Sequence, residues 1–92
     1  MTAEDIFRKV ADYYGITYAQ ILSDSAIIDH LEPRKRAVYL CCQNGLTRQY
    51  VAAVLGVDAE TVRIWHDDIA AIAHVIQPYL AAIMRAQKNP AD

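Results

Sequence analysis

The sequence is poor in the residues that build long loops, bridges and membrane spans. Its 92 residues include three glycines, three prolines and two cysteines. So few glycines and prolines leave little room for long loops. Cys41 and Cys42 are adjacent, so they are poor candidates for bridging each other, and we expect both to face a helical core. No apolar run reaches the roughly 18 residues of a membrane span and no signal peptide opens the chain, which predicts a cytoplasmic protein.

Patterns typical of catalysis and metal binding are also missing from the sequence. It has no Ser-His-Asp or Cys-His arrangement, no glycine-rich phosphate loop and no paired-carboxylate site. His30, His66 and His74 are scattered, and none has a cysteine or carboxylate at metal-ligand spacing. We therefore expect neither an enzyme, nor a cofactor, nor a metal site.

The chain has no excess of positive charge. Nine lysines and arginines stand against eleven aspartates and glutamates, for a net charge of −2. Neutralisation of phosphates supplies much of the affinity of DNA-binding proteins, so this balance disfavours strong non-specific binding. A locally basic face remains compatible with it.

What the sequence does contain is a large apolar fraction at helical spacing. Hydrophobic residues make up 54 % of the chain, which argues against disorder, and no alternating run resembles a strand. The length suits one core. We therefore predict a compact all-α domain over residues 1–92, with a helix-turn-helix and an extended C-terminal helix.

The first half of the chain shows clear helix boundaries. Thr2 precedes acidic residues and predicts a helix start, and Gly15 suits its C-cap. Thr17 opens a second short helix. Residues 23–33 are the least regular segment, and a third helix is expected from about Glu32 to Gln43, ended by Asn44 and Gly45.

The chain is organised around residues 47–69, TRQYVAAVLGVDAETVRIWHDDI. Ala52 and Gly56 are four apart, as in a close helix corner, and Asp58 is a natural N-cap for a second helix. Val62, Ile64, Trp65 and Ile69 supply the apolar residues of that second helix. The pattern is a helix-turn-helix, whose second helix can enter a DNA major groove. An ordinary helical corner is the alternative.

Residues 69–88 form an apolar C-terminal extension. Pro78 is expected to bend the helix near Gln77 or to start a new one there. The extension carries more apolar groups than a solvated tail needs. It either closes the core or forms a homodimer contact through residues 69–86.

Two groups of polar residues are candidates for DNA contact on the helix-turn-helix. Arg48 and Gln49 start its first helix, whose N-terminal amides can bind a phosphate. Thr61, Arg63 and His66 lie on its second helix, where Arg63 can reach a guanine edge or a phosphate. The alternative for Arg63 is a solvated face shared with the neighbouring Glu60 and Asp67.

A third candidate group is the densest basic cluster of the chain. Arg34, Lys35 and Arg36 share one helix turn and could clamp the DNA backbone. The alternative is a solvated basic turn paired with Asp29 or Glu32.

Several segments together resemble a known family. IFRKVADYYGITYAQILS (6–23), Pro33 followed by RKRAVYLC (34–41), and LGVDAETV (55–62) resemble, in order and spacing, the C-terminal DNA-binding domain (domain IV) of the bacterial replication initiator DnaA. The resemblance runs from Asp5 to Ile69. It implies an all-α fold with a Trp-repressor-like helix-turn-helix, binding of double-stranded DNA, and a role in regulating replication or transcription. It also places Arg34 near phosphates.

The resemblance is weaker at the residues that read DNA. The arginine and histidine of the family's signature Arg-Asp-His-Thr-Thr-Val are absent here, whereas Thr61 keeps the threonine before the valine, and the family's arginine-rich loop is replaced by SDSAIIDHLE (23–32). This leaves a second hypothesis, in which the same scaffold regulates by contacting a protein partner such as the initiator. The acidic loop at 24–32 favours that alternative.

Overall fold

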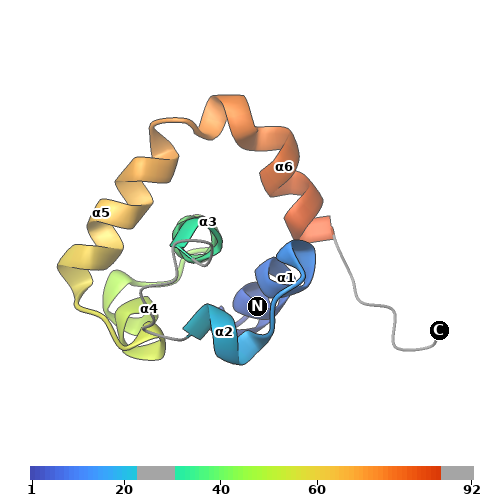
Figure 1. Cartoon of the computed structure of the whole chain (residues 1–92). Coiled ribbons are helices and arrows are strands. Elements are labelled where there is room, and N and C mark those ends of the chain that lie inside the picture. Colours follow the sequence, from blue (N-terminus) through green and yellow to red (C-terminus); the bar gives the residue numbers. More distant parts are fainter. Residues whose placement is uncertain (23–30, 86–92) are drawn as a thin grey trace.

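The computed structural model describes residues 1–22 and 31–85, and every regular element within these ranges is a helix (Figure 1). The prediction of an all-α fold is confirmed. Residues 23–30, which make up most of the irregular segment and of the acidic loop, lie outside the described residues. The helices are α1 (Ala3–Tyr14), α2 (Tyr18–Leu22), α3 (Leu31–Gln43), α4 (Arg48–Leu55), α5 (Ala59–Ala70) and α6 (Ala73–Arg85).

Local capping sets the ends of the first two helices. The Thr2 hydroxyl accepts a hydrogen bond from the Asp5 amide at 3.1 Å, and the Asp5 carboxylate accepts one from the Thr2 amide at 3.0 Å. Gly15 ends α1 in the left-handed conformation, with φ of 70°. Thr17 and Gln20 repeat the reciprocal cap at the start of α2, at 2.8 and 3.0 Å. The predicted helix starts and the Gly15 C-cap are therefore confirmed.

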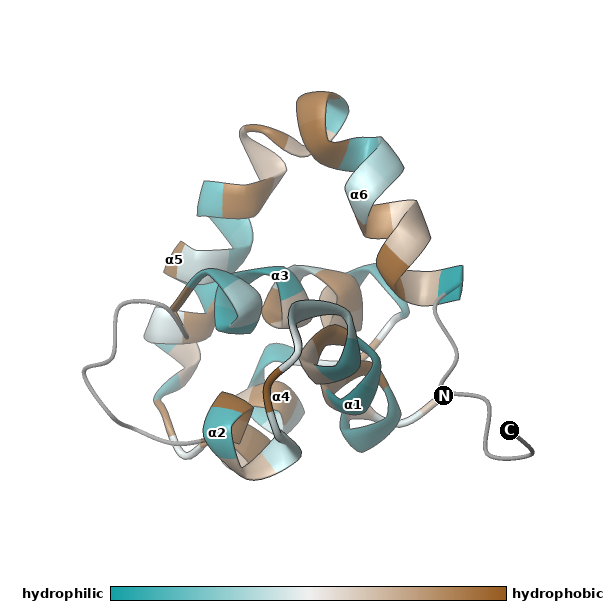
Figure 2. Cartoon of the chain, turned by 45° about the vertical axis from the view of Figure 1, so that its right-hand side comes forward, coloured by the Kyte–Doolittle hydropathy of each residue, from teal (hydrophilic) through white to brown (hydrophobic). Residues whose placement is uncertain are grey.

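Helix α3 lies at the centre of the fold. Figure 1 shows it end-on with the other helices around it, and it contacts α1, α2, α4 and α5. Figure 2 shows the hydrophobic residues of α1 on its side toward α3. Val38 and Cys41 of α3 are fully buried, whereas Cys42 is half-buried. Burial raises the pKa of the Cys41 thiol to about 12, so this thiol stays neutral in the folded protein.

Of the two alternatives at Pro78, the start of a new helix is wrong, and a bend near Gln77 stays a prediction. Helix α6 runs through Pro78, and the break lies earlier, at Ala71 and Ile72. A proline removes the hydrogen bond to the carbonyl four residues before it, here that of His74. His74 and Pro78 are both exposed, so water can reach the side of the helix where that bond is missing. The helix can therefore continue.

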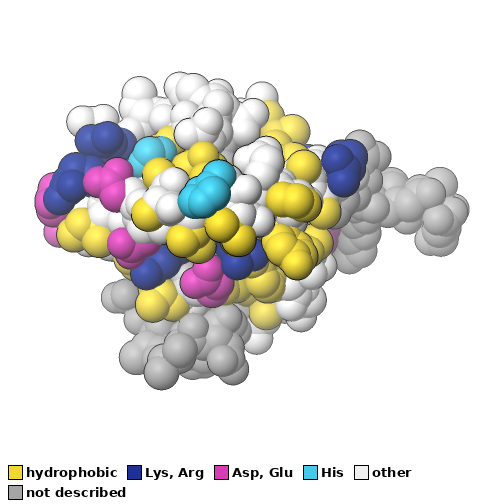
Figure 3. Space-filling model, turned by 90° about the horizontal axis from the view of Figure 1, so that it is seen from above, with side chains coloured by type: hydrophobic (Ala, Val, Ile, Leu, Met, Phe, Trp, Pro, Cys, Tyr) yellow, Lys and Arg dark blue, Asp and Glu magenta, His cyan; other side chains and the backbone are white. Residues whose placement is uncertain are grey.

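The C-terminal stretch closes the core, and it also leaves an apolar face exposed. Ile76, Leu80 and Ile83 of α6 are buried. Ile72, Val75 and Tyr79 are between 41 % and 63 % exposed, and Figure 3 shows hydrophobic side chains gathered over this part of the molecule. The homodimer contact through residues 69–86 stays a prediction. Within residues 1–22 and 31–85, no helix has the length and hydropathy needed to cross a membrane.

Candidate nucleic-acid interface

Helices α4 and α5 form the predicted helix-turn-helix. Gly56 ends α4 in the left-handed conformation, with φ of 72°, and its amide donates to the Ala52 carbonyl at 2.8 Å. Two residues later the Asp58 carboxylate accepts a hydrogen bond of 2.8 Å from the Thr61 amide and so caps α5. Hydrogen bonds from Thr61 lower the pKa of Asp58 below its ordinary value near 3.8. The corner therefore has a defined geometry at both helix ends.

The N-terminus of α4 is open to solvent. The Thr47 hydroxyl accepts a hydrogen bond of 3.1 Å from the Tyr50 amide, which is one of the amides at this helix end that have no partner within the helix. Arg48 and Gln49 occupy the first two helical positions and are exposed. Arg48 forms no ion pair within the described part of the chain, so its guanidinium and the nearby amides are available to an anion.

The outer face of α5 carries an arginine held between two carboxylates. The Arg63 Nε donates to both Glu60 oxygens at 3.1 and 3.2 Å, and its Nη2 also donates to Glu60 Oε1. The Arg63 Nη1 donates to Asp67 Oδ2 at 3.1 Å. These contacts raise the pKa of Arg63 and lower that of Glu60. Figure 3 shows basic and acidic side chains interleaved over α5, rather than a continuous basic stripe.

The other two predicted contacts of α5 lie to either side of this face. The His66 ring stacks on Tyr39 of α3, with centroids 5.2 Å apart and planes at 25°, and its Nδ1 lies 3.2 Å from Asp67 Oδ1. Thr61 is half-buried in the first turn. The structure therefore places Arg63 centrally, with Thr61 and His66 at the flanks.

Ile64 differs from the other apolar residues of α5 in its exposure. It is 45 % exposed, whereas Val62 and Ile69 are buried and Trp65 is half-buried. Successive helical residues are about 100° apart, so Ile64 lies about 200° from Val62 and points away from the core. The outer face of the second helix thus presents an apolar side chain beside Arg63.

The basic turn of α3 does not form one open surface. Arg34 is 7 % exposed, and its Nε donates to the Ile21 carbonyl at 3.0 Å. Lys35 Nζ lies 2.8 Å from Asp68 Oδ2, and Arg36 Nε lies 3.2 Å from Glu32 Oε1. Asp29, the other predicted partner, lies outside the described residues. The turn therefore joins α3 to α2 and α5 through two of its three cations.

Sequence reasoning missed the ion pair between Lys35 and Asp68. The two residues are 33 positions apart, so no local spacing announces the contact. The Arg63 contacts with Glu60 and Asp67 do have a local signal, because residues three and four apart are neighbours on a helix.

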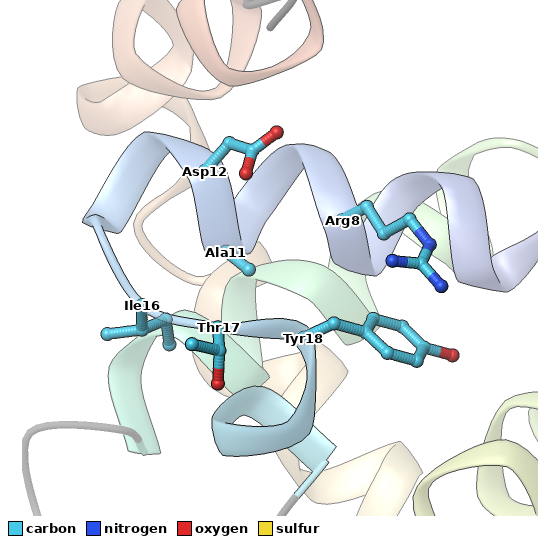
Figure 4. A pocket seen from close by; sticks show the side chains of 6 residues that line it. All are labelled: Arg8, Ala11, Asp12, Ile16, Thr17 and Tyr18. Atoms are coloured by element: carbon cyan, nitrogen blue, oxygen red, sulfur yellow. The ribbon is translucent and has the colours of Figure 1, made fainter.

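A pocket of about 410 Å³ lies between α1 and the start of α2 (Figure 4). The Arg8 guanidinium lies over the Tyr18 ring, 4.1 Å from its centroid. The lining offers one cation, one carboxylate and two hydroxyls, that of Tyr18 and that of Thr17, which already caps α2. This set of groups lacks a nucleophile paired with a base. The residues lining the pocket are Arg8, Ala11, Asp12, Ile16, Thr17 and Tyr18.

The chain is similar to a segment of two known proteins. The chain is 42 % identical over 43 residues to the chromosomal replication initiator protein DnaA of Ruegeria pomeroyi, a match that covers 47 % of this chain and 9 % of that protein. It is 40 % identical over 43 residues to DnaA of a further Ruegeria strain, with the same coverage. The chain resembles the C-terminal domain of DnaA. No protein-family model matches it.

The similarity to DnaA concerns a small part of that protein, since the matched segment is 9 % of the length of either relative. What DnaA as a whole does therefore does not transfer to this chain by similarity alone.

Among the described residues, no group of three or more His, Cys, Asp or Glu side chains could hold a metal ion.

Proposed function

We propose that this chain binds double-stranded DNA through the helix-turn-helix of α4 and α5 and acts in the regulation of replication or transcription. The observation that carries the proposal is the capped corner from Gly56 to Asp58, followed by a helix whose outer face is polar around Arg63. Helix α5 would enter the major groove, as second helices of this motif do. The similarity to two chromosomal replication initiator proteins supports it.

Phosphate contacts in this proposal come first from α4. Arg48 is exposed and has no ion pair among the described residues, and Gln49 is exposed beside it at the same helix end. Backbone amides at a helix N-terminus add a favourable electrostatic field for a phosphate. These two residues would fix the register of the domain on the duplex without reading bases.

The predicted clamp on α3 would contribute less to DNA contact than α4 does. Lys35 and Arg36 each hold one carboxylate and keep part of their donor capacity for a phosphate. Arg34 acts through the fold, because its buried guanidinium ties α3 to the end of α2. His66 and Thr61 would contact the edges of the groove beside Arg63.

Fluorescence anisotropy with a labelled duplex tests the proposal. We expect dissociation constants near the micromolar range at low salt, weakening as salt rises, because phosphate contacts release counterions. Arg48→Ala should weaken binding, whereas Arg85→Ala should leave it unchanged, since Arg85 is an exposed cation at the far end of α6. Absence of duplex binding at low salt, or an equal loss in both variants, would contradict the proposed function.

A further inference from the structure

The carboxylates around Arg63 fix which of its donors remain free. A guanidinium has five N–H groups. Glu60 occupies the Nε–H and one N–H of Nη2, and Asp67 occupies one N–H of Nη1. One N–H therefore remains on each terminal nitrogen. These free N–H groups belong to Nη1 and Nη2, whereas Glu60 covers the edge formed by Nε and Nη2.

Two N–H groups on adjacent terminal nitrogens match one base edge in particular. In the major groove guanine presents two neighbouring acceptors, N7 and O6, and a bidentate arginine is their usual partner. Arg63 lies on the outer face of α5 within its second turn, and its side chain is 43 % exposed. In helix-turn-helix proteins the N-terminal part of the second helix contacts the base edges. Position and donor geometry thus agree.

The same contacts order the arginine before any ligand arrives. A free arginine loses rotamer freedom when it binds, which weakens the contact it makes. Here Glu60 and Asp67 hold the guanidinium from both sides, so less freedom is left to lose. The two carboxylates also repel phosphates, which disfavours binding by sequence-independent charge attraction.

Ile64 supplies a second, apolar element on this face. Its side chain follows Arg63 in sequence and is 45 % exposed. An apolar side chain in the major groove contacts the methyl group of thymine. A thymine next to the guanine would therefore bury Ile64.

We propose that Arg63, held by Glu60 and Asp67, reads a guanine in the major groove, with Ile64 against the methyl group of a neighbouring thymine. This inference rests on the proposed function, because it requires a duplex on α5. It assigns Glu60 and Asp67 as positioning residues, which act on DNA through Arg63.

The test starts from duplexes selected out of a random pool by the full chain. The wild-type chain should select a guanine, and replacing that base by 7-deazaguanine, which lacks the N7 acceptor, should weaken binding about tenfold. Arg63→Lys keeps the charge but not the planar fork, so it should bind both duplexes with equal affinity. Arg48→Ala is the matched control, and it should weaken both duplexes by the same factor.

The carboxylates give an independent readout. Glu60→Gln and Asp67→Asn should each strengthen binding to a random duplex while reducing the preference for guanine over 7-deazaguanine. Bound duplexes without an Arg63-dependent guanine preference would overturn this inference and leave the proposed function standing. Failure of the wild-type chain to retain any duplex at low salt would overturn both.

Discussion

Arginines of this chain differ in what their surroundings leave them free to do. Arg34 is buried against the Ile21 carbonyl, Arg63 is held by two carboxylates, and Arg48 is exposed at a helix start. Net charge says little about these differences, because it counts all three equally. At the scale of single residues, the neighbours of each cation decide whether it supports the fold, orients a contact or meets a phosphate.

Arg34→Ala should destabilise the fold by about 2–3 kcal/mol, because it removes a charged hydrogen bond from a buried carbonyl and the packing of the side-chain stem. Urea unfolding followed by circular dichroism measures the effect. Arg48→Ala, which removes an exposed side chain, should stay within about 0.5 kcal/mol of the wild type. A similarly small change for Arg34→Ala would show that its burial contributes nothing to stability.

At the scale of elements, the helix ends are the features that the sequence predicts most directly. The caps at Thr2, Gly15, Gly56 and Asp58 all use partners within a few residues, so local sequence is enough to predict them. The turn at Gly56 matters most, because it sets the angle between α4 and α5 and so the direction in which the second helix presents its outer face.

Gly56→Ala should destabilise the domain by about 1–2 kcal/mol, because a side chain at φ of 72° is strained even where space is open. Gly56→Asn should cost less, since asparagine tolerates the left-handed conformation better. Thermal unfolding of the two variants compares them. Equal losses would mean that the strain lies elsewhere than in the backbone conformation.

Asp58 makes the stability of α5 depend on pH. Its pKa is lowered in the folded state, so its charge stabilises the fold fully above the unfolded value near 3.8, and this contribution is lost as pH falls through the lower folded value. Asp58→Asn keeps an acceptor but has no charge. Its melting temperature should lie below that of the wild type at pH 7, because the charge at the helix N-terminus is lost, and the gap should close toward pH 2. A gap that does not change with pH would contradict this account.

The limits of sequence reasoning also appear at this scale. Ile64 is apolar, but the positions of Val62 and Ile69 set the buried side of α5, and helical geometry turns Ile64 outward. The Lys35–Asp68 pair was not predictable, because it depends on how α3 and α5 pack. Pro78 favoured a bend or a new helix, because proline lacks the N–H that the helix needs. Water reaches the exposed side of α6 where that hydrogen bond is missing, so the helix continues through Pro78.

At the scale of the whole molecule, α5 and α6 present surfaces of different character. Basic and acidic side chains interleave over α5, and hydrophobic side chains gather over α6 (Figure 3). A surface of mixed charge favours contacts that depend on exact position over general attraction to phosphates. The exposed apolar face of α6 is the natural place for the predicted homodimer contact, and it lies apart from the proposed DNA-binding residues of α4.

An NMR titration of the ¹⁵N-labelled chain with a duplex tests the central claim most directly, because it reports every contacted amide. Binding through the helix-turn-helix predicts shifts at Arg48, Gln49 and the first two turns of α5, and little change along Ala73–Arg85. Shifts concentrated on α6, or no shifts at low salt, would contradict it.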